Sequence, residues 1–145
     1  MTTPPAELIA LIKKSESCSL TAYQCPAGVW TCGWGSTGAD VTATTRWTQA
    51  QADARLAADM MRFVADALRL SPGLAKQPPG RLAAIADFCY NAGAHAYEDS
   101  TLRKLVNAGD WTSAKTELGK WVRGGGRVLP GLVVRRAADA ALLGA

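Results

Sequence analysis

The spacing of apolar residues divides the chain into a short helix, a strand-rich segment and a longer helical part. Apolar residues at helical spacing between positions 8 and 12 predict a first helix that ends near Glu16. Between positions 20 and 41, aromatic and β-branched residues are interrupted by glycines, a pattern typical of a small antiparallel sheet with tight turns.

Two longer helices are expected next. Thr48 and Gln51 have the spacing of a capping box, so the longest helix should begin there and end at residues 71–73, which read Ser-Pro-Gly. A more apolar segment follows and ends near Gly93. Its composition predicts a buried central helix.

The last third of the chain should form three more helices. Ser100 can cap a helix that Gly109 closes, and Asp110 can cap another that runs toward Trp121. Pro130 is placed to begin the last helix, which extends through residue 142. The order of elements predicts an α+β fold in which a sheet and a helical lobe form two halves around a cleft.

Composition and charge limit the classes of protein to consider. The 145 residues suffice for a single domain over 1–145, and 48% hydrophobic with 19% charged residues excludes a disordered chain. The formal charge of +4 favours a polyanionic partner such as nucleic acid, acidic lipid or bacterial wall polymer. No nucleic-acid-binding motif is present, so nucleic acid is not expected as a partner, and a monomer is expected.

Metal, cofactor and membrane roles have little support in the sequence. The four cysteines, Cys18, Cys25, Cys32 and Cys89, lack CxxC spacing, and His95 is the one histidine. We therefore expect no metal and no cofactor. No early apolar run has the length of a signal peptide or a membrane span, so no stable membrane insertion is expected.

Glu16 is a candidate general acid because it stands where the first helix gives way to the sheet. Eight residues separate it from Cys25, and five separate Cys25 from Thr31. This spacing resembles the active-site signature of the phage-type lysozymes, the endolysin family, which reads Glu, eight residues, Asp or Cys, five residues, Thr. Further segments match that family in order: 33–35, 88–93, 100–110, 121–126 and 129–136.

The resemblance implies a lysozyme-like fold, with a small antiparallel sheet lobe, a mainly α-helical lobe and a substrate cleft between them. It also implies hydrolysis of the β-1,4 bond between N-acetylmuramic acid and N-acetylglucosamine in peptidoglycan, with inversion. Glu16 would be the general acid, and Cys25 and Thr31 would position or activate water. Trp34, Gly35 and Arg135 are expected to bind substrate, and Arg135 could instead pair with Glu16.

Cysteine at position 25 is the main departure from the commoner aspartate. A free thiol has a pKa of about 8.5, so Cys25 could be a weaker base or only a polar ligand of water. In some exported relatives a disulfide holds the enzyme inactive, and Cys18 with Cys25 could form such a regulatory bond; four reduced cysteines are the alternative. Ser36 stands where many relatives have histidine, and Asp40 is the fallback for the second catalytic group.

Two other functions remain open at this point. A lytic transglycosylase would use the acid but form an anhydromuramyl end, one water lighter than the hydrolysis product. A noncatalytic peptidoglycan-binding protein would have lost its base at Cys25. For an endolysin, the resemblance implies residence in the host cytoplasm before lysis and action on the wall after holin-type release.

Overall fold

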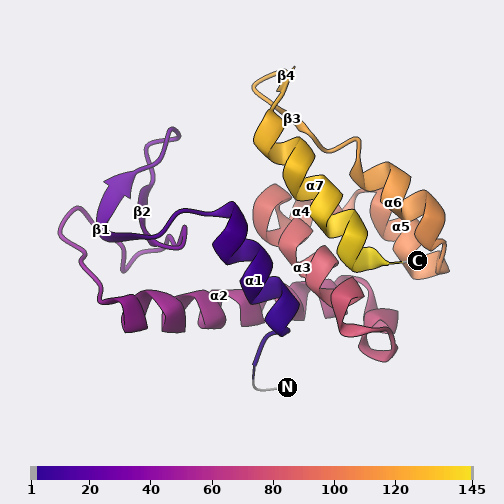
Figure 1. The fold of residues 1–145 in the computed structure, drawn as a ribbon, viewed down its shortest axis with the longest axis horizontal. Helices are drawn as coiled ribbons and strands as arrows, with labels where there is room; N and C mark the ends of the chain where they lie inside the picture. Colours follow the sequence, from indigo (N-terminus) through magenta and orange to yellow (C-terminus); the bar gives the residue numbers. More distant parts are fainter. Residues whose placement is uncertain (1–2, 145) are drawn as a thin grey trace.

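The computed structural model describes residues 3–144, and Figure 1 shows a β-hairpin on one side and most of the helices on the other. Helix α1 (Ala6–Ser15) leads into the hairpin of β1 (Ser19–Gln24) and β2 (Trp30–Gly33). The long helix α2 (Gln49–Leu70) then runs beneath both parts and connects them (Figure 1).

The helical lobe contains the rest of the elements: η1 (Pro72–Lys76), α3 (Pro79–Ala92), α4 (Ala94–Glu98), α5 (Thr101–Ala108), α6 (Trp111–Leu118), β3 (Arg123–Gly124), β4 (Arg127–Val128) and α7 (Pro130–Leu143). The α+β prediction is confirmed, as is each helix expected from periodicity. The short elements η1 and α4 and the β3–β4 hairpin were not predicted.

Local capping signals fix several helix ends as expected. The Thr48 hydroxyl accepts from the Gln51 amide at 3.1 Å while the Gln51 side chain accepts from the Thr48 amide at 2.8 Å. Ser100 and Asp110 cap α5 and α6 in the same way through their side-chain oxygens. Gly109 ends α5 with φ +72°, a left-handed conformation that glycine adopts without strain.

Helix α3 lies at the centre of the helical lobe, packed against α1, α2 and α7. Eight consecutive residues, Leu82 to Cys89, are buried, so this helix is apolar on all sides except at Asp87. A charged residue in such a position needs a partner of opposite charge, because an isolated buried carboxylate is very costly.

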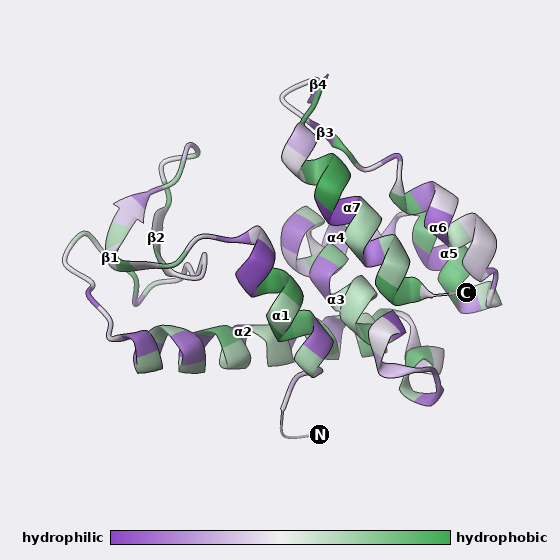
Figure 2. Ribbon diagram, in the orientation of Figure 1, coloured by the Kyte–Doolittle hydropathy of each residue, from purple (hydrophilic) through white to green (hydrophobic). Residues whose placement is uncertain are grey.

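Helices α3 and α7 pack closely and antiparallel. A Cβ at Gly80 would come within 2.7 Å of the Leu142 carbonyl oxygen, so only glycine fits at this crossing. The Arg81 Nε donates to the Leu143 carbonyl at 2.8 Å. Figure 2 shows that apolar residues at the start of α7 give way to a hydrophilic band at its middle, and this band faces α3 through Arg135.

Two details differ from the sequence prediction. The helix that Asp110 caps ends at Leu118 instead of continuing toward Trp121, because Gly119 and the glycines at 124–126 favour turns and the chain forms the β3–β4 hairpin. His95, expected in a loop, lies in α4 and is fully exposed. No helix within residues 3–144 has both the length and the apolar character needed to cross a membrane.

The Thr48 capping box should stabilise the long helix that joins the two parts of the molecule. Thr48→Ala removes the accepting oxygen and should lower the free energy of unfolding by about 1 kcal/mol, measured by urea denaturation. Thr48→Ser keeps that oxygen and is the matched control, expected to cost only a few tenths of this amount. Equal losses in the two variants would show that the cap contributes nothing.

Candidate active site

Glu16 is the residue at which α1 ends and the chain turns toward the hairpin. Its backbone is extended, with φ −109° and ψ 145°, while its N–H still donates to the Ile12 carbonyl at 2.8 Å. The side chain therefore leaves the helix end in a fixed direction and remains 30% exposed. A carboxyl group in this position can contact both the protein interior and a ligand in solvent.

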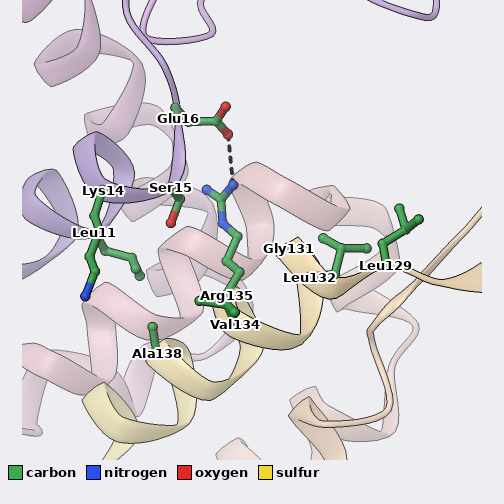
Figure 3. A pocket seen from close by; sticks show the side chains of 10 residues that line it. All are labelled: Leu11, Lys14, Ser15, Glu16, Leu129, Gly131, Leu132, Val134, Arg135 and Ala138. Carbon is green, nitrogen blue, oxygen red and sulfur yellow. Dashed lines mark hydrogen bonds and ion pairs between the residues drawn. The ribbon is translucent and has the colours of Figure 1, made fainter.

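Arg135 of α7 holds this carboxyl group from below. Its Nη1 donates to Glu16 Oε1 at 2.8 Å, as Figure 3 shows, and its Nη2 donates to Asp87 Oδ1 at 2.7 Å. The Arg135 Nε lies 3.2 Å from Asp87 Oδ2, so the guanidinium is bound to Asp87 by two of its nitrogens. Arg135 thus connects the central helix with the end of the first helix.

The Arg135 side chain is only 6% exposed, and the Asp87 side chain is not exposed at all. Burial alone would lower the pKa of Arg135, but hydrogen bonds and charge attraction from Asp87 and Glu16 outweigh it and raise the pKa above its ordinary value. Arg135 is therefore a permanent positive charge beside Glu16. Its donors are directed at these two carboxylates, and the substrate contact expected of Arg135 stays a prediction.

Gly35 lies against the Glu16 carboxyl group on the side of the hairpin. Its φ is +99°, and a Cβ there would come within 2.6 Å of the Tyr90 hydroxyl and 3.8 Å of Glu16 Oε2. The Tyr90 hydroxyl donates to the Gly35 carbonyl at 3.3 Å, and burial raises the pKa of Tyr90, so this donor keeps its proton. Both the backbone conformation and the close approach require glycine at this position.

Trp34, the neighbouring residue, is half-buried and attached to α2. Its indole N–H donates to Asp53 Oδ1 at 2.7 Å, and the Lys13 ammonium lies 5.4 Å from its ring centroid. These contacts fix the plane of the ring next to the Gly35 turn.

Cys25 and Thr31 lie together at the tip of the β1–β2 hairpin. The Cys25 N–H donates to the Val29 carbonyl at 3.0 Å, and the Thr31 hydroxyl donates to the same carbonyl at 3.0 Å. Hydrogen bonds from the backbone of Val29 and Ala27, helped by the Thr31 side chain, lower the pKa of the Cys25 thiol. The hairpin therefore favours the thiolate, which is the basic form of this side chain.

A cavity of about 500 Å³ opens beside Glu16, between the end of α1 and the first turns of α7. Figure 3 shows the residues that line it: Leu11, Lys14, Ser15, Glu16, Leu129, Gly131, Leu132, Val134, Arg135 and Ala138. Its walls are apolar apart from Lys14, Ser15 and the Glu16–Arg135 pair. Cys25 and Thr31 are on the hairpin and do not line this cavity.

Comparison with known proteins agrees with this geometry. Residues 13–139 match the family described as phage lysozyme. The chain is 39% identical over 140 residues to an endolysin of Acyrthosiphon pisum secondary endosymbiont phage 1, covering 92% of each. The chain belongs to the phage lysozyme family. Family membership makes it an enzyme of the lysozyme type.

Two further matches show how much of each relative this phage lysozyme domain covers. It is 34% identical over 139 residues to an endolysin of Bacillus phage PZA, covering 92% of this chain but 52% of the relative. The muramidase domain of SpmX from Asticaccaulis excentricus superposes with a TM-score of 0.85 at 29% identity, covering 97% of each chain. The expected lysozyme-like fold is confirmed.

The four cysteines of this phage lysozyme are free thiols in the described conformation. Cys18 and Cys25 directly precede and follow β1, which has six residues. Seven residue steps of about 3.3 Å correspond to about 23 Å between the two Cα atoms in a straight strand, whereas a disulfide needs about 7 Å or less. A Cys18–Cys25 bond therefore requires another conformation of β1, and the regulatory disulfide stays a prediction.

Asp40 and Ser36, two further residues considered in the sequence analysis, each form a side-chain hydrogen bond. Asp40, the fallback for the second catalytic group, accepts from Arg55 Nη1 at 2.6 Å, and this hydrogen bond lowers the pKa of the Asp40 carboxyl. The Ser36 hydroxyl donates to the buried Asp59 carboxylate at 2.6 Å. Within residues 3–144, no group of three or more His, Cys, Asp or Glu side chains could hold a metal ion.

Asp87 and Tyr90 were not identified from the sequence, although both help to hold Glu16 or Gly35. Asp87 did carry a usable signal, because it is the one acidic residue inside the buried, apolar run of α3. Tyr90 ends that run and looks like an ordinary core aromatic residue.

The buried Arg135–Asp87 pair should be far more important for stability than an exposed pair. Arg135→Met leaves Asp87 charged and without its partner in the interior and should lower the free energy of unfolding by about 3–5 kcal/mol in urea denaturation. The matched control is Arg69→Met, which breaks the exposed Arg69–Asp66 pair of 3.3 Å and should cost less than about 1 kcal/mol.

Replacing both partners should be much less harmful than replacing Arg135 alone. The double variant Arg135→Met with Asp87→Leu removes both buried charges and should recover part of the lost stability. If Arg135→Met costs no more than Arg69→Met, the buried pair does not have the importance assigned to it.

Proposed function

We propose that this chain hydrolyses the β-1,4 bond between N-acetylmuramic acid and N-acetylglucosamine in bacterial peptidoglycan, with Glu16 as the general acid. Membership of the phage lysozyme family supports a peptidoglycan-hydrolysing endolysin. The observation that carries the proposal is the setting of Glu16, whose Oε1 is bound by Arg135 while Oε2 lies next to the Gly35 turn.

Arg135 supports this role by orienting Glu16 and by stabilising the charge that forms on it. When the protonated carboxyl group gives its proton to the leaving glycosidic oxygen, a carboxylate develops 2.8 Å from the guanidinium. The guanidinium is already in place, so no reorganisation is needed as the charge develops. Arg135 therefore acts through Glu16 and not on the sugar.

Cys25 and Thr31 handle the attacking water in this proposal. The water oxygen forms the new bond to the anomeric carbon, the bond to the leaving oxygen breaks, and the Cys25 thiolate takes the proton released from water. The Thr31 hydroxyl, which donates its proton to the Val29 carbonyl, can accept a hydrogen bond from this water and so position it. The lowered pKa of Cys25 makes the thiolate available at a lower pH than in a free cysteine.

The substrate and place of action follow from the same proposal. Trp34 and Gly35 are proposed to line the sugar-binding cleft, since they form the turn that lies between the hairpin and Glu16. The net charge of +4 suits an anionic cell wall, and salt should weaken that association. Action on the wall after release from the host cytoplasm is the corresponding proposal for localisation.

Glu16→Gln removes the acid but keeps the size of the side chain and an oxygen for Arg135. The rate of lysis of outer-membrane-permeabilised bacteria, followed by turbidity, should fall by about 10²- to 10⁴-fold. Binding to isolated cell walls should persist. Glu7→Gln changes an exposed glutamate of the same helix and should lyse at the wild-type rate. Undiminished lysis by Glu16→Gln would exclude Glu16 as the acid.

The second group can be tested through the pH dependence of lysis in reduced protein. Cys25→Asp replaces a thiol of ordinary pKa about 8.5 with a carboxyl of about 3.9, so the acidic limb of the profile should move to lower pH. Cys25→Ala should lower the rate at every pH. The control, Cys18→Ser, should keep the wild-type profile. An acidic limb at the same pH in wild type and Cys25→Asp would mean that another group activates the water.

A further inference from the structure

A second buried carboxyl group lies one helical turn beyond Arg135 on α7. Asp139 is completely buried, and its Oδ2 is 3.5 Å from Arg136 Nε. If Asp139 is ionised, neither of its carboxylate oxygens has a hydrogen-bond partner among residues 3–144. Buried polar atoms are nearly always hydrogen-bonded, so this group requires an explanation.

Arg136 does not supply the missing hydrogen bond to Asp139. Its Nη2 donates to Asn91 on α3 and its guanidinium lies 5.1 Å from the Phe88 ring centroid, while Nε and Nη1 make no hydrogen bond within the described chain. The contact between Arg136 and Asp139 is therefore long and without the paired hydrogen bonds of a strong buried ion pair.

The group that faces Asp139 from α3 is Asp87, which is also completely buried. Arg135 donates three contacts to Asp87, with two of them on Oδ1 and one on Oδ2. Two ionised carboxylates in contact repel one another and cannot form a hydrogen bond, because both only accept. One proton between them removes the repulsion and supplies the missing donor.

We propose that Asp139 is protonated at neutral pH and donates a hydrogen bond to Asp87, so that the two carboxyl groups together carry one negative charge. The charges facing Asp139 are Asp87 on α3 and Arg135 and Arg136 on its own helix. Burial first, and then the charge of Asp87, raise the pKa of Asp139 to about 10.

The proton has a consequence for the active site, which rests on the role proposed for Glu16. Asp139 fixes Asp87, Asp87 binds two nitrogens of Arg135, and Arg135 holds Glu16. Asp139 is thus a positioning residue that acts from the interior through two other side chains. A charge on Asp139 would compete with Glu16 for Arg135.

Folding should take up one proton at Asp139 over a wide pH range. In the unfolded chain an aspartate ionises near pH 4, whereas in the folded protein burial and the charge of Asp87 hold the pKa of Asp139 well above that value. The folded state therefore binds the additional proton between these values, and its stability falls as the pH rises. The stabilising effect of low pH is complete below the unfolded pKa and is lost progressively above it.

Asp139→Asn tests this directly, because the amide donates to Asp87 and accepts from Arg136 without ionising. Between pH 6 and pH 9, the unfolding equilibrium constant of the wild type, divided by that of Asp139→Asn, should rise by a factor of about ten per pH unit. The variant should therefore have the higher melting temperature at pH 8. Asp99→Asn, which removes an exposed aspartate, should keep the wild-type pH dependence. Equal pH slopes in wild type and Asp139→Asn would overturn the proposal.

A second measurement tests the protonation state of Asp139 even if Asp139→Asn does not fold. In wild-type protein labelled with ¹³C at aspartate carboxyl carbons, the Asp139 signal should have the chemical shift of a protonated acid at pH 7. A signal that titrates below pH 5 would overturn the proposal. Both measurements are independent of lysis, so their failure is distinct from failure of the proposed enzyme.

The positioning role of Asp139 is tested separately by the rate of lysis. Asp139→Asn should lyse within about 2-fold of wild type, whereas Asp139→Leu, which cannot donate to Asp87, should lose activity on the order of tenfold while remaining folded. Equal activity of the asparagine and leucine variants would show that the hydrogen bond to Asp87 has no effect on Glu16.

Discussion

The charge of Arg135 is buried between the central helix and the first helix, and the arrangement of the site depends on this fact. A guanidinium taken out of water must be surrounded by carboxylates, and Asp87 and Glu16 supply them from α3 and from the end of α1. Glu16 is 119 residues from Arg135 in the chain, so their contact joins the beginning of the protein to its last helix. The orientation of the candidate acid is thus a product of the packing of the helical lobe.

The hairpin is held together by different interactions. Cys25 and Thr31 are brought together by a tight turn and a two-stranded ladder, with their polar atoms bonded to the backbone at Val29. Gly35 then allows the chain to pass close to Glu16 and Tyr90. One candidate group is therefore held by buried charge and the other by local backbone geometry.

The sequence predicts best those features that depend on neighbouring residues. Thr48, Ser100 and Asp110 cap their helices as expected, because a cap needs only a side-chain oxygen and an amide about three residues away. The contacts of Asp87 and Asp139 could not be predicted in this way, since they depend on how α3 and α7 pack. The pairing of Arg135 with Glu16 was foreseen as one possibility through the family resemblance, but its depth of burial was not.

The central claim, acid catalysis by Glu16 with attack by a water held at Cys25 and Thr31, is tested most directly by the stereochemistry of the product. Proton NMR of peptidoglycan fragments, recorded during the first minutes of digestion, identifies the anomer formed before mutarotation. Attack by water from the face opposite the leaving group predicts a reducing N-acetylmuramic acid end that appears first as the α-anomer. A β-anomer formed first, or a 1,6-anhydro end, would contradict it.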